Sequence, residues 1–583
     1  MQESATIQYA TQSAPRLPRW RVGLIIILAM WAVIKIPEWV APTSMVRLNG
    51  MIWGPIVGAV LSLIWLLFFS RLPWSTRLST FVAFVVGAAI ALVLGHPTMR
   101  RMGMIVLAMP ITISLLVLWI VLASGQNPRL LRSGAILVAL VGWSFFTMRR
   151  MDGLTGDIHP ALSWRWSSTA EDRYLASLSK AKASSPTTST ASSIVLSDGD
   201  WPAFRGVHRD GKVTGAPIRT DWAVRPPKQI WKHNIGPGWS SLCVVGDRLF
   251  TLEQRRESEV TVCMNSNTGE ELWSHADQTR FSESMGGDGP RSTPTFADEK
   301  LYVLGACGKL NCLDPSNGSV IWSRDLVADT GAALPMFGFS SSPLIQKGLV
   351  TVLTGASGKA IATYDAATGK PAWSTGDGWS YASPQLTTID GVEQILYINQ
   401  SGLSGLDPAT GQTFWHYDFP LPGNANRVTQ PTAINEHDFL LGASFGAGTR
   451  RINVAHDGST WKATSPWYSK SFNPYYNDAV YHKGFCYGFD NSVFACMDIE
   501  TGKSKWRSHG YGNGQVLLLA DQDLLLILTE KGEVALLDAK PDSQHEIGRF
   551  QAIEGKTWNH PVIAHGKLFV RNSEEVAAFE MEK

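Results

Sequence analysis

Apolar residues gather in five long runs at the start of the chain. The runs cover roughly 22–40, 51–69, 79–95, 103–123 and 133–148. Most approach the ~20 residues that a helix needs to cross a ~30 Å hydrocarbon core. A cleavable signal peptide would not be followed by four more runs of this kind. The pattern therefore predicts a transmembrane anchor of five helices over residues 1–150.

Arginines between the runs favour one orientation of this anchor. With the N-terminus in the cytoplasm, the inner segments hold seven arginines and the outer segments five. The positive-inside rule favours this arrangement, which places everything after residue 150 outside the cytoplasm. We therefore expect a multi-pass protein of the cytoplasmic (inner) membrane, with the lipid bilayer as a partner and a periplasmic or exocytoplasmic domain. No run has an acid or a histidine at mid-depth, so a transporter is not supported.

Residues 151–199 differ from the anchor in composition. Eight of the ten residues from Ser184 to Ser193 are Ser or Thr. A segment of this composition has little apolar surface to bury and is typically flexible. We interpret residues 151–199 as a Ser/Thr-rich linker.

After residue 200 the pattern changes to short strand-type runs and a recurring phrase. The phrase reads CMNSNTGEELW, GLDPATGQTFW and CMDIETGKSKW in three of its copies. Asp and Thr-Gly supply a tight turn, and the closing aromatic ring can pack between neighbouring units. The copies end at Trp273, Trp322, Trp373, Trp415, Trp461, Trp506 and Phe550, 42 to 51 residues apart. We interpret these aromatic residues as packing residues.

A period of this length is typical of propellers and solenoids. Before each phrase lie two short runs rich in β-branched and aromatic residues, as in KLYVLGACGKLNCLD. Four strands per unit make a propeller blade. The C-terminal unit lacks its last strand, and QIWKHNI around Trp231 lacks the strands before it. Together they complete an eighth blade, so we predict an all-β eight-bladed propeller over residues 200–583 behind an α-helical transmembrane bundle.

The phrase resembles the tryptophan-docking motif A-x-D-x-x-T-G-x-x-x-W of proteins with pyrroloquinoline quinone (PQQ) repeats. DWPAFRGVHRDG, at the start of the domain, is similar to the first segment of PQQ-binding-like propellers. That family includes quinoprotein dehydrogenases and non-enzymatic scaffolds. The five apolar runs also resemble the anchor of membrane-bound quinoprotein glucose dehydrogenase. For the enzymes of the family, the resemblance implies PQQ with Ca²⁺ at the mouth of the central channel.

The inner strands should begin at that mouth, and they carry short polar groups, aromatic rings and two arginines. Such a set suits a flat anionic ligand, because arginines bind carboxylates and aromatic faces stack. The same Ser and Thr residues are equally expected if they only satisfy backbone groups at strand starts. The predicted cofactor-binding residues are Trp239, Arg291, Arg427, Asn477, Trp558 and Asn559.

An active quinoprotein also needs a carboxylate base to take the proton of its substrate. The candidates near the mouth are Asp288, Asp478 and Glu283, with His560 as an alternative base. Calcium ligands come from scattered positions, so the sequence assigns no metal ligands. The absence of C-x-x-C-H excludes covalent haem c. The absence of an adjacent cysteine pair and the short blades both weigh against an enzyme.

The distribution of charge and the positions of the cysteines bear on the partners and the disulfides of the protein. Residues 1–150 carry 13 Lys and Arg against two acids, whereas the remainder carries 38 against 47. An acidic propeller argues against a nucleic-acid partner. All six cysteines lie in the propeller, and Cys486 and Cys496 flank one turn. A disulfide between them and buried free thiols are both compatible with the sequence.

We therefore predict a membrane-anchored exocytoplasmic propeller that acts as a ligand-binding or protein-interaction module. Its partner would be a small anionic ligand or another protein. The alternative is a quinoprotein oxidoreductase, a PQQ-dependent sugar or alcohol dehydrogenase that donates electrons to membrane quinone.

Overall fold

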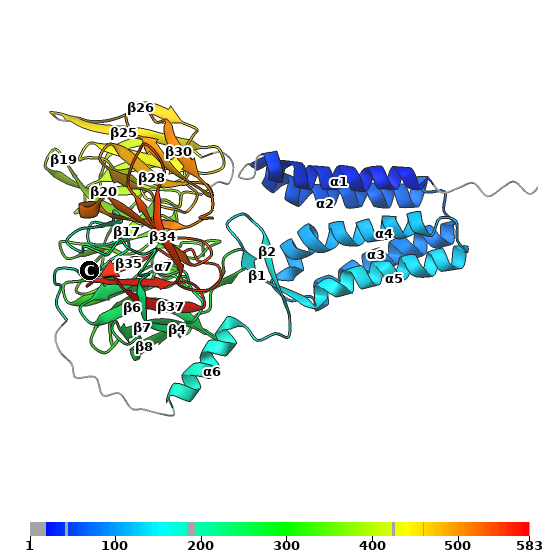
Figure 1. Ribbon diagram of the computed structural model, residues 1–583, viewed down its shortest axis with the longest axis horizontal. Helices are drawn as coiled ribbons and strands as arrows, with labels where there is room; N and C mark the ends of the chain where they lie inside the picture. The colour runs from blue at the N-terminus through cyan, green and yellow to red at the C-terminus, as the bar shows by residue number, and fades with distance from the viewer. Residues whose placement is uncertain (1–18, 41–44, 183–193, 422–425, 459, 582–583) are drawn as a thin grey trace, which may run out of the picture. The chain divides into compact units, whose positions relative to one another are not determined.

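The computed structural model divides into two compact units, the first helical and the second built of strands (Figure 1). Unit 1 comprises Met1–Asp152 and Ala161–Ser167, and unit 2 comprises Gly153–Pro160 and Ser168–Lys583. The structure describes residues 19–40, 45–182, 194–421, 426–458 and 460–581.

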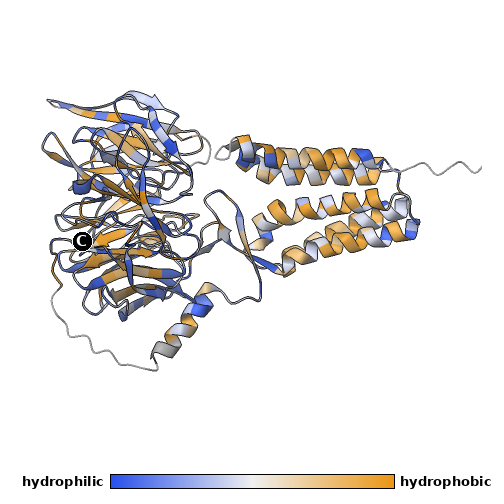
Figure 2. Cartoon of the chain, viewed as in Figure 1, coloured by the Kyte–Doolittle hydropathy of each residue, from blue (hydrophilic) through white to orange (hydrophobic). Residues whose placement is uncertain are grey.

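Five apolar helical stretches make up most of unit 1, and Figure 2 shows apolar residues along their whole length. By length and composition each can cross a membrane, which makes the chain a multi-pass membrane protein. This confirms the five predicted spans. Small residues allow close helix packing, since a Cβ at Gly87 would lie 2.9 Å from Trp143. The stretches are α1 (Trp20–Val40), α2 (Met45–Ile64) with η1 (Trp65–Phe69), α3 (Trp74–Leu94), η2 (Met99–Ala108) with α4 (Met109–Leu122), and α5 (Pro128–Thr147).

The structure differs from the predicted linker over its first part. β1 (Arg149–Leu154) and β2 (Pro160–Trp164) pair as a hairpin, and α6 (Ala170–Lys182) follows. α6 is fixed to blade 1 because the Tyr174 hydroxyl donates to Glu253 at 2.8 Å. The linker prediction does not account for this buried tyrosine. The Ser/Thr-rich stretch 184–193 lies outside the described residues.

Eight sheets form the propeller, each with four antiparallel strands and one with a fifth, parallel strand, which confirms the predicted fold class. Blades 1 to 4 are β5–β8 (Cys243–Val245, Arg248–Arg255, Ser258–Asn265, Glu271–Asp277), β11–β14 (Thr295–Ala297, Lys300–Leu304, Lys309–Leu313, Val320–Asp325), β15–β18 (Leu344–Gln346, Leu349–Ala356, Lys359–Asp365, Pro371–Thr375) and β19–β22 (Gln385–Ile389, Val392–Ile398, Gly402–Leu406, Thr413–Asp418). Blades 5 to 7 are β23–β26 (Thr432–Ala433, Asp438–Ala443, Gly448–Asp457, Thr460–Ser469), β27–β30 (Val480–His482, Phe485–Asp490, Val493–Asp498, Ser504–Ser508) and β31–β34 (Gln515–Leu519, Leu524–Leu528, Glu533–Asp538, Glu546–Gln551).

Short elements lie between or beside the blades. β9 (Ser282–Glu283) and β10 (Gly287–Asp288) pair in the connection from blade 1 to blade 2. α7 (Leu326–Thr330) follows blade 2, and η3 (Ala520–Gln522) joins two strands of blade 7. β3 (Lys212–Val213) adds to blade 7 as a fifth strand, parallel to β31.

Blade 8 is assembled from both ends of the propeller chain. β35 (Val562–Ala564), β36 (Lys567–Arg571) and β37 (Glu575–Glu580) pair in order, and β4 (Lys228–Asn234) pairs antiparallel with β37. This confirms the predicted closure by the segment around Trp231. Backbone hydrogen bonds of a complete sheet therefore close the ring.

Tryptophans join most blades to the next. Trp415 of blade 4 instead donates to Gln394 of its own blade at 2.7 Å, and the phrase of blade 7 ends at Phe550. Trp273 Nε1 donates to the Pro315 carbonyl at 2.9 Å, and its ring occupies the space that a Cβ at Gly318 would need. Trp231 packs in the same way on Gly269 across the closing seam. The turn glycine and the tryptophan of the phrase thus belong to one contact between blades, which is the packing role that the sequence predicts.

Blade 5 departs from the predicted repeat. Trp467, not Trp461, donates to the next blade, at 2.8 Å from the Ile499 carbonyl, and covers Gly502. β25 and β26 are each ten residues long. The longer hairpin places Trp461 away from the seam, where it stacks on His456 with ring centroids 4.3 Å apart.

All six cysteines are free thiols. Cys486 lies opposite Met497 and Cys496 lies opposite Tyr487, so the two sulfur-bearing residues flanking the turn do not pair across the strands. Burial raises the pKa of both thiols. They behave as small buried apolar groups.

Candidate functional site

A ring of hydrogen bonds joins the inner strands around the propeller axis. From blade 1 to blade 6, a backbone N–H of each blade donates to a side-chain oxygen of the next blade, with N···O distances of 2.6–3.2 Å. The Ser241 hydroxyl also donates to the His560 carbonyl at 2.8 Å. We call the participating residues ring residues: Ser241, Thr293, Ser342, Ser383, Gln430, Asp478 and His560. The ring explains why most of these positions carry a hydroxyl, an amide or a carboxylate.

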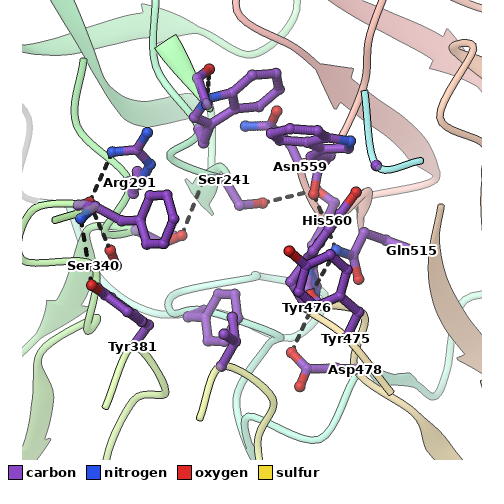
Figure 3. A pocket seen from close by; sticks show the side chains of 18 of the residues that line it. Ser241, Arg291, Ser340, Tyr381, Tyr475, Tyr476, Asp478, Gln515, Asn559 and His560 are labelled. Carbon is purple, nitrogen blue, oxygen red and sulfur yellow. Dashed lines mark hydrogen bonds and ion pairs between the residues drawn. The ribbon is translucent and has the colours of Figure 1, made fainter. Parts of the chain in front are cut away.

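Inside the ring lies a cavity of about 240 Å³ (Figure 3). Side chains alternate along an extended chain, so the residue two positions before each ring residue also points to the axis. These residues are Trp239, Arg291, Ser340, Tyr381, Val428, Tyr476 and Trp558, and all of them line the cavity. Trp239 and Trp558 pack with ring centroids 4.8 Å apart, and Tyr476 lies 5.2 Å from Trp558. The walls are therefore largely aromatic.

The floor of the cavity comes from residues 200–213, which we call the floor segment. It starts at a backbone bridge between Trp201 and Val244 in blade 1 and ends as β3 beside blade 7. Between these two points Phe204 lines the cavity and packs on His560 with ring centroids 5.0 Å apart. The segment thus crosses the propeller and closes one end of the channel.

Arg205, Asp478 and His560 form a buried charged group at this floor. Their exposed fractions are 2%, 3% and 7%. Asp478 Oδ2 lies 3.7 Å from Arg205 Nε and 3.1 Å from His560 Nε2. Asp478 Oδ1 accepts the Gln430 N–H at 2.6 Å. Both carboxylate oxygens are therefore engaged by protein groups.

Burial sets the protonation of this group. Loss of water raises the pKa of Asp478, and Arg205 and the Gln430 N–H act against that rise. Burial first, and the charge of Arg205 second, lower the pKa of His560 from 6.5 to about 3. His560 is therefore neutral at pH 7, and its Nε2 shares a hydrogen bond with Asp478 Oδ2. A histidine that resists protonation so strongly is a weak general base at neutral pH.

Arg291 lies at the opposite end, which we call the mouth. Its guanidinium contacts Glu283 Oε1 at 2.7 Å and donates to the Phe337 carbonyl at 2.8 Å. It also packs over the rings of Phe281 and Phe337, 5.0 Å and 5.8 Å from their centroids. Of the described residues that line the cavity, Arg291 is the only Arg or Lys. Its charge is already balanced within the protein.

The structure brings most of the predicted site residues to the cavity. Those in the lining are Trp239, Arg291, Asp478, Trp558, Asn559 and His560. Asp288 and Glu283 are outside the lining, and each is paired with an arginine. Asp288 lies 2.5 Å from Arg280.

Arg427 and Asn477 point away from the cavity. They precede the ring residues Gln430 and Asp478 by three positions and one position, so strand alternation turns both toward the blades. Arg427 is 1% exposed and donates to the Phe419 carbonyl. Asn477 is fully buried and donates to a carbonyl of blade 7 at 2.6 Å. Neither is placed to hold a ligand in the cavity.

Sequence reasoning missed several lining groups. Tyr381, Val428 and Tyr476 share the spacing of two positions before a ring residue, and aligning the repeats on that position could have found them. The turn between β1 and β2, residues 153–160, also lines the cavity. It has no repeat and no charge run, so nothing in its sequence points to the propeller.

PQQ with Ca²⁺ does not fit these residues well. An anionic quinone needs free cations, and Arg291 is paired with Glu283. A calcium ion needs free oxygen ligands, and both oxygens of Asp478 are engaged. Within the described residues, a group with metal-ligand spacing is found at Asp390, Glu436 and His437, on turns of blades 4 and 5 and outside the cavity lining.

The fold and this cavity define an eight-bladed propeller with tryptophan-docked repeats behind five apolar helices. The profile of a family described as "Outer membrane protein assembly factor BamB" matches residues 256–508. This confirms the resemblance to PQQ-repeat propellers. The match covers less than half of the chain.

Two curated proteins and two solved structures are similar to parts of this chain. The outer membrane protein assembly factor BamB of Burkholderia pseudomallei (strain K96243) is 23% identical over 308 residues, 52% of this chain and 74% of that protein. BamB of Aliivibrio fischeri (strain ATCC 700601 / ES114) is 43% identical over 61 residues, 10% and 16% of the two chains. BamB from Moraxella catarrhalis has a TM-score of 0.44 at 16% identity, covering 60% of this chain and 97% of that one. The quinohemoprotein alcohol dehydrogenase from Comamonas testosteroni has a TM-score of 0.47 at 13% identity, covering 65% and 80%.

Proposed function

We propose that this chain is a membrane-anchored binding module whose propeller lies on the exocytoplasmic side and uses its axial cavity to hold a ligand or a partner. The observation that carries the proposal is the pairing of the charged groups at the cavity. Arg291 is balanced by Glu283, and Asp478 is held by Arg205 and His560. A cavity of this kind suits a neutral occupant that packs on aromatic walls.

The relatives support an interaction role. The two curated proteins are named as assembly factors for outer membrane proteins. A propeller presents loops from eight blades around one opening, so many chain segments can contact one partner. An anchor of five helices would keep such a module at the membrane surface.

A quinoprotein oxidoreductase is the second candidate, and one feature favours it. Trp239 and Trp558 present large aromatic faces to the cavity, as a flat ring system would require. The candidate bases are less favourable, because the pKa of His560 is lowered to about 3 and Asp478 is fully engaged. A direct binding experiment separates the two candidates.

The experiment is a titration of the purified full-length chain with PQQ, with and without Ca²⁺, followed by tryptophan fluorescence. We expect no saturable binding to the wild type. The variant Glu283→Gln frees Arg291 and should gain weak affinity for the anion, whereas Asp288→Asn, whose carboxylate pairs with Arg280, should not. Saturable, Ca²⁺-dependent binding to the wild type that Arg291→Ala abolishes would overturn the binding-module proposal in favour of the dehydrogenase.

A further inference from the structure

A short turn of the chain itself fills the mouth of the cavity. Residues 153–160, which we call the tip, connect β1 and β2, and the tip is part of the same compact unit as the propeller. Leu154, Thr155, Gly156 and Ile158 all line the cavity. The mouth therefore already holds a polypeptide. The contacts between the tip and the propeller define what kind of ligand the mouth accepts.

The propeller recognises the backbone of the tip. The Leu154 N–H donates to the Met285 carbonyl at 2.6 Å, and the Leu154 carbonyl accepts from Lys556 Nζ at 2.9 Å. The Gly156 N–H donates to Glu530 Oε1 at 2.5 Å. These three bonds use groups that every polypeptide has. They come from parts of the propeller that lie far apart in the sequence.

The propeller residues that face the tip accept only glycine at its centre. A Cβ at Gly156 would collide with the Asn513 side-chain amide and lie 2.6 Å from the Tyr476 hydroxyl. Asn513 is 1% exposed, and its Nδ2, like the Tyr476 hydroxyl, has no hydrogen-bond partner among the described residues. Two buried donors thus face the tip without being satisfied by it. A ligand that supplies acceptors there would bind better than the tip does, because an unsatisfied buried donor costs free energy.

The tip is also strained. Ile158 has φ of +60°, which is unfavourable for a β-branched side chain. The conformation is held by a tight turn in which the Ile158 N–H donates to the Thr155 carbonyl at 2.9 Å. The tip is therefore strained, makes three backbone hydrogen bonds to the propeller and faces two unsatisfied donors. A ligand without these disadvantages can replace it in the mouth.

We propose that the mouth of the cavity is a polypeptide-binding site that the tip occupies in competition with a partner. The ligand class is a tight polypeptide turn with a central glycine flanked two residues away on each side by aliphatic residues, as in Leu154-Thr-Gly156-Asp-Ile158. This inference deepens the proposed binding function. The partner segment displaces the tip, forms the same backbone bonds and places its aliphatic side chains against the aromatic walls.

The test uses a fluorescent peptide with the sequence of residues 152–160, DGLTGDIHP. It is titrated into the full-length wild type and into Gly156→Val, in which the chain's own tip no longer fits. A tethered tip competes at a high effective concentration, so we expect the peptide to bind Gly156→Val at least ten-fold more tightly. A control peptide with Val in place of the central Gly should bind neither protein.

Two results would overturn the proposal: equal binding of both peptides, or no binding of DGLTGDIHP to a folded Gly156→Val chain. Hydrogen exchange on the wild type covers the case in which the variant does not fold. Excess DGLTGDIHP should release the tip and speed amide exchange within residues 153–160, and unchanged exchange at saturating peptide would also overturn it. If PQQ binds and the peptide does not, both proposals are rejected. If neither PQQ nor the peptide binds, only the polypeptide-binding site is rejected.

Discussion

The two ends of one cavity are closed in different ways. At the floor, residues 200–213 bring Arg205 into a buried pair with Asp478 and continue into a strand of blade 7. At the mouth, the tip makes hydrogen bonds to Met285, Lys556 and Glu530 and leaves donors of Tyr476 and Asn513 unsatisfied. Arg205 Nε and Arg209 Nε of the floor segment are also unsatisfied, so the two ends differ in how each segment is anchored: the floor segment continues into a strand of a blade, and the tip does not.

The floor and the mouth of the cavity therefore have different roles, the first in folding and the second in binding. The charged groups that first suggest chemistry, Asp478 and His560, belong to the floor and to the hydrogen-bonded ring. Tyr476 and Asn513, whose unsatisfied donors face the tip, lie at the mouth. We therefore expect substitutions at the floor to change folding and substitutions at the mouth to change the tip and its competitors.

The largest effect is expected from Arg205→Ala at the floor. It leaves Asp478 buried without its cation, and breaking a buried pair costs about 3–5 kcal/mol of the free energy of unfolding. Urea unfolding of the full-length chain measures this loss. Arg225→Ala is the matched control. Arg225 pairs with Asp221, four residues before it, at the surface, and the Arg225 side chain is 66% exposed. Equal losses in the two variants would contradict a structural role for the floor.

A smaller effect is expected from the pH dependence of His560. Its pKa is about 3 in the folded chain against 6.5 when exposed. Below pH 6.5 the unfolded chain therefore binds a proton that the folded chain does not, so stability falls as pH falls, by up to about 1.4 kcal/mol per pH unit. The raised pKa of Asp478 acts in the opposite direction.

His560→Gln tests this pH dependence because glutamine keeps a donor but does not titrate. Unfolding midpoints at pH 7, 6 and 5 should fall more steeply for the wild type than for the variant. Parallel curves would mean that His560 is not held neutral by burial. The floor would then be more open to water than the 7% exposed fraction of His560 indicates.

The repeat made the propeller predictable, because each blade carries its own turn, strands and docking ring. Trp273 and Trp231 pack as the phrase implies. The side-chain direction at the inner strands was harder to predict, since a shift of one residue reverses it. Arg291 and Arg427 look equivalent in the sequence, yet they precede their ring residues by two and by three positions and face opposite ways.

The tip could not be predicted, for a different physical reason. Its contacts to Met285, Glu530 and Lys556 join parts of the chain that are far apart, and no local pattern specifies them. Trp461 shows the same limit on a smaller scale. Its phrase is intact enough to be recognised, but the length of β25 and β26 transfers the docking role to Trp467.

The smallest effect on folding is expected from Lys556→Met at the mouth. The substitution removes the bond to the Leu154 carbonyl but keeps an unbranched side chain against Trp558, whose ring centroid lies 4.3 Å from Lys556 Nζ. One hydrogen bond contributes about 1 kcal/mol, which is about a five-fold change in the equilibrium for release of the tip. Amide exchange within residues 153–160 should therefore speed up by that factor while the urea midpoint of the propeller stays unchanged. A matching loss of propeller stability would show that the tip is part of the folded core, as the floor segment is, and would remove the distinction between the two ends of the cavity.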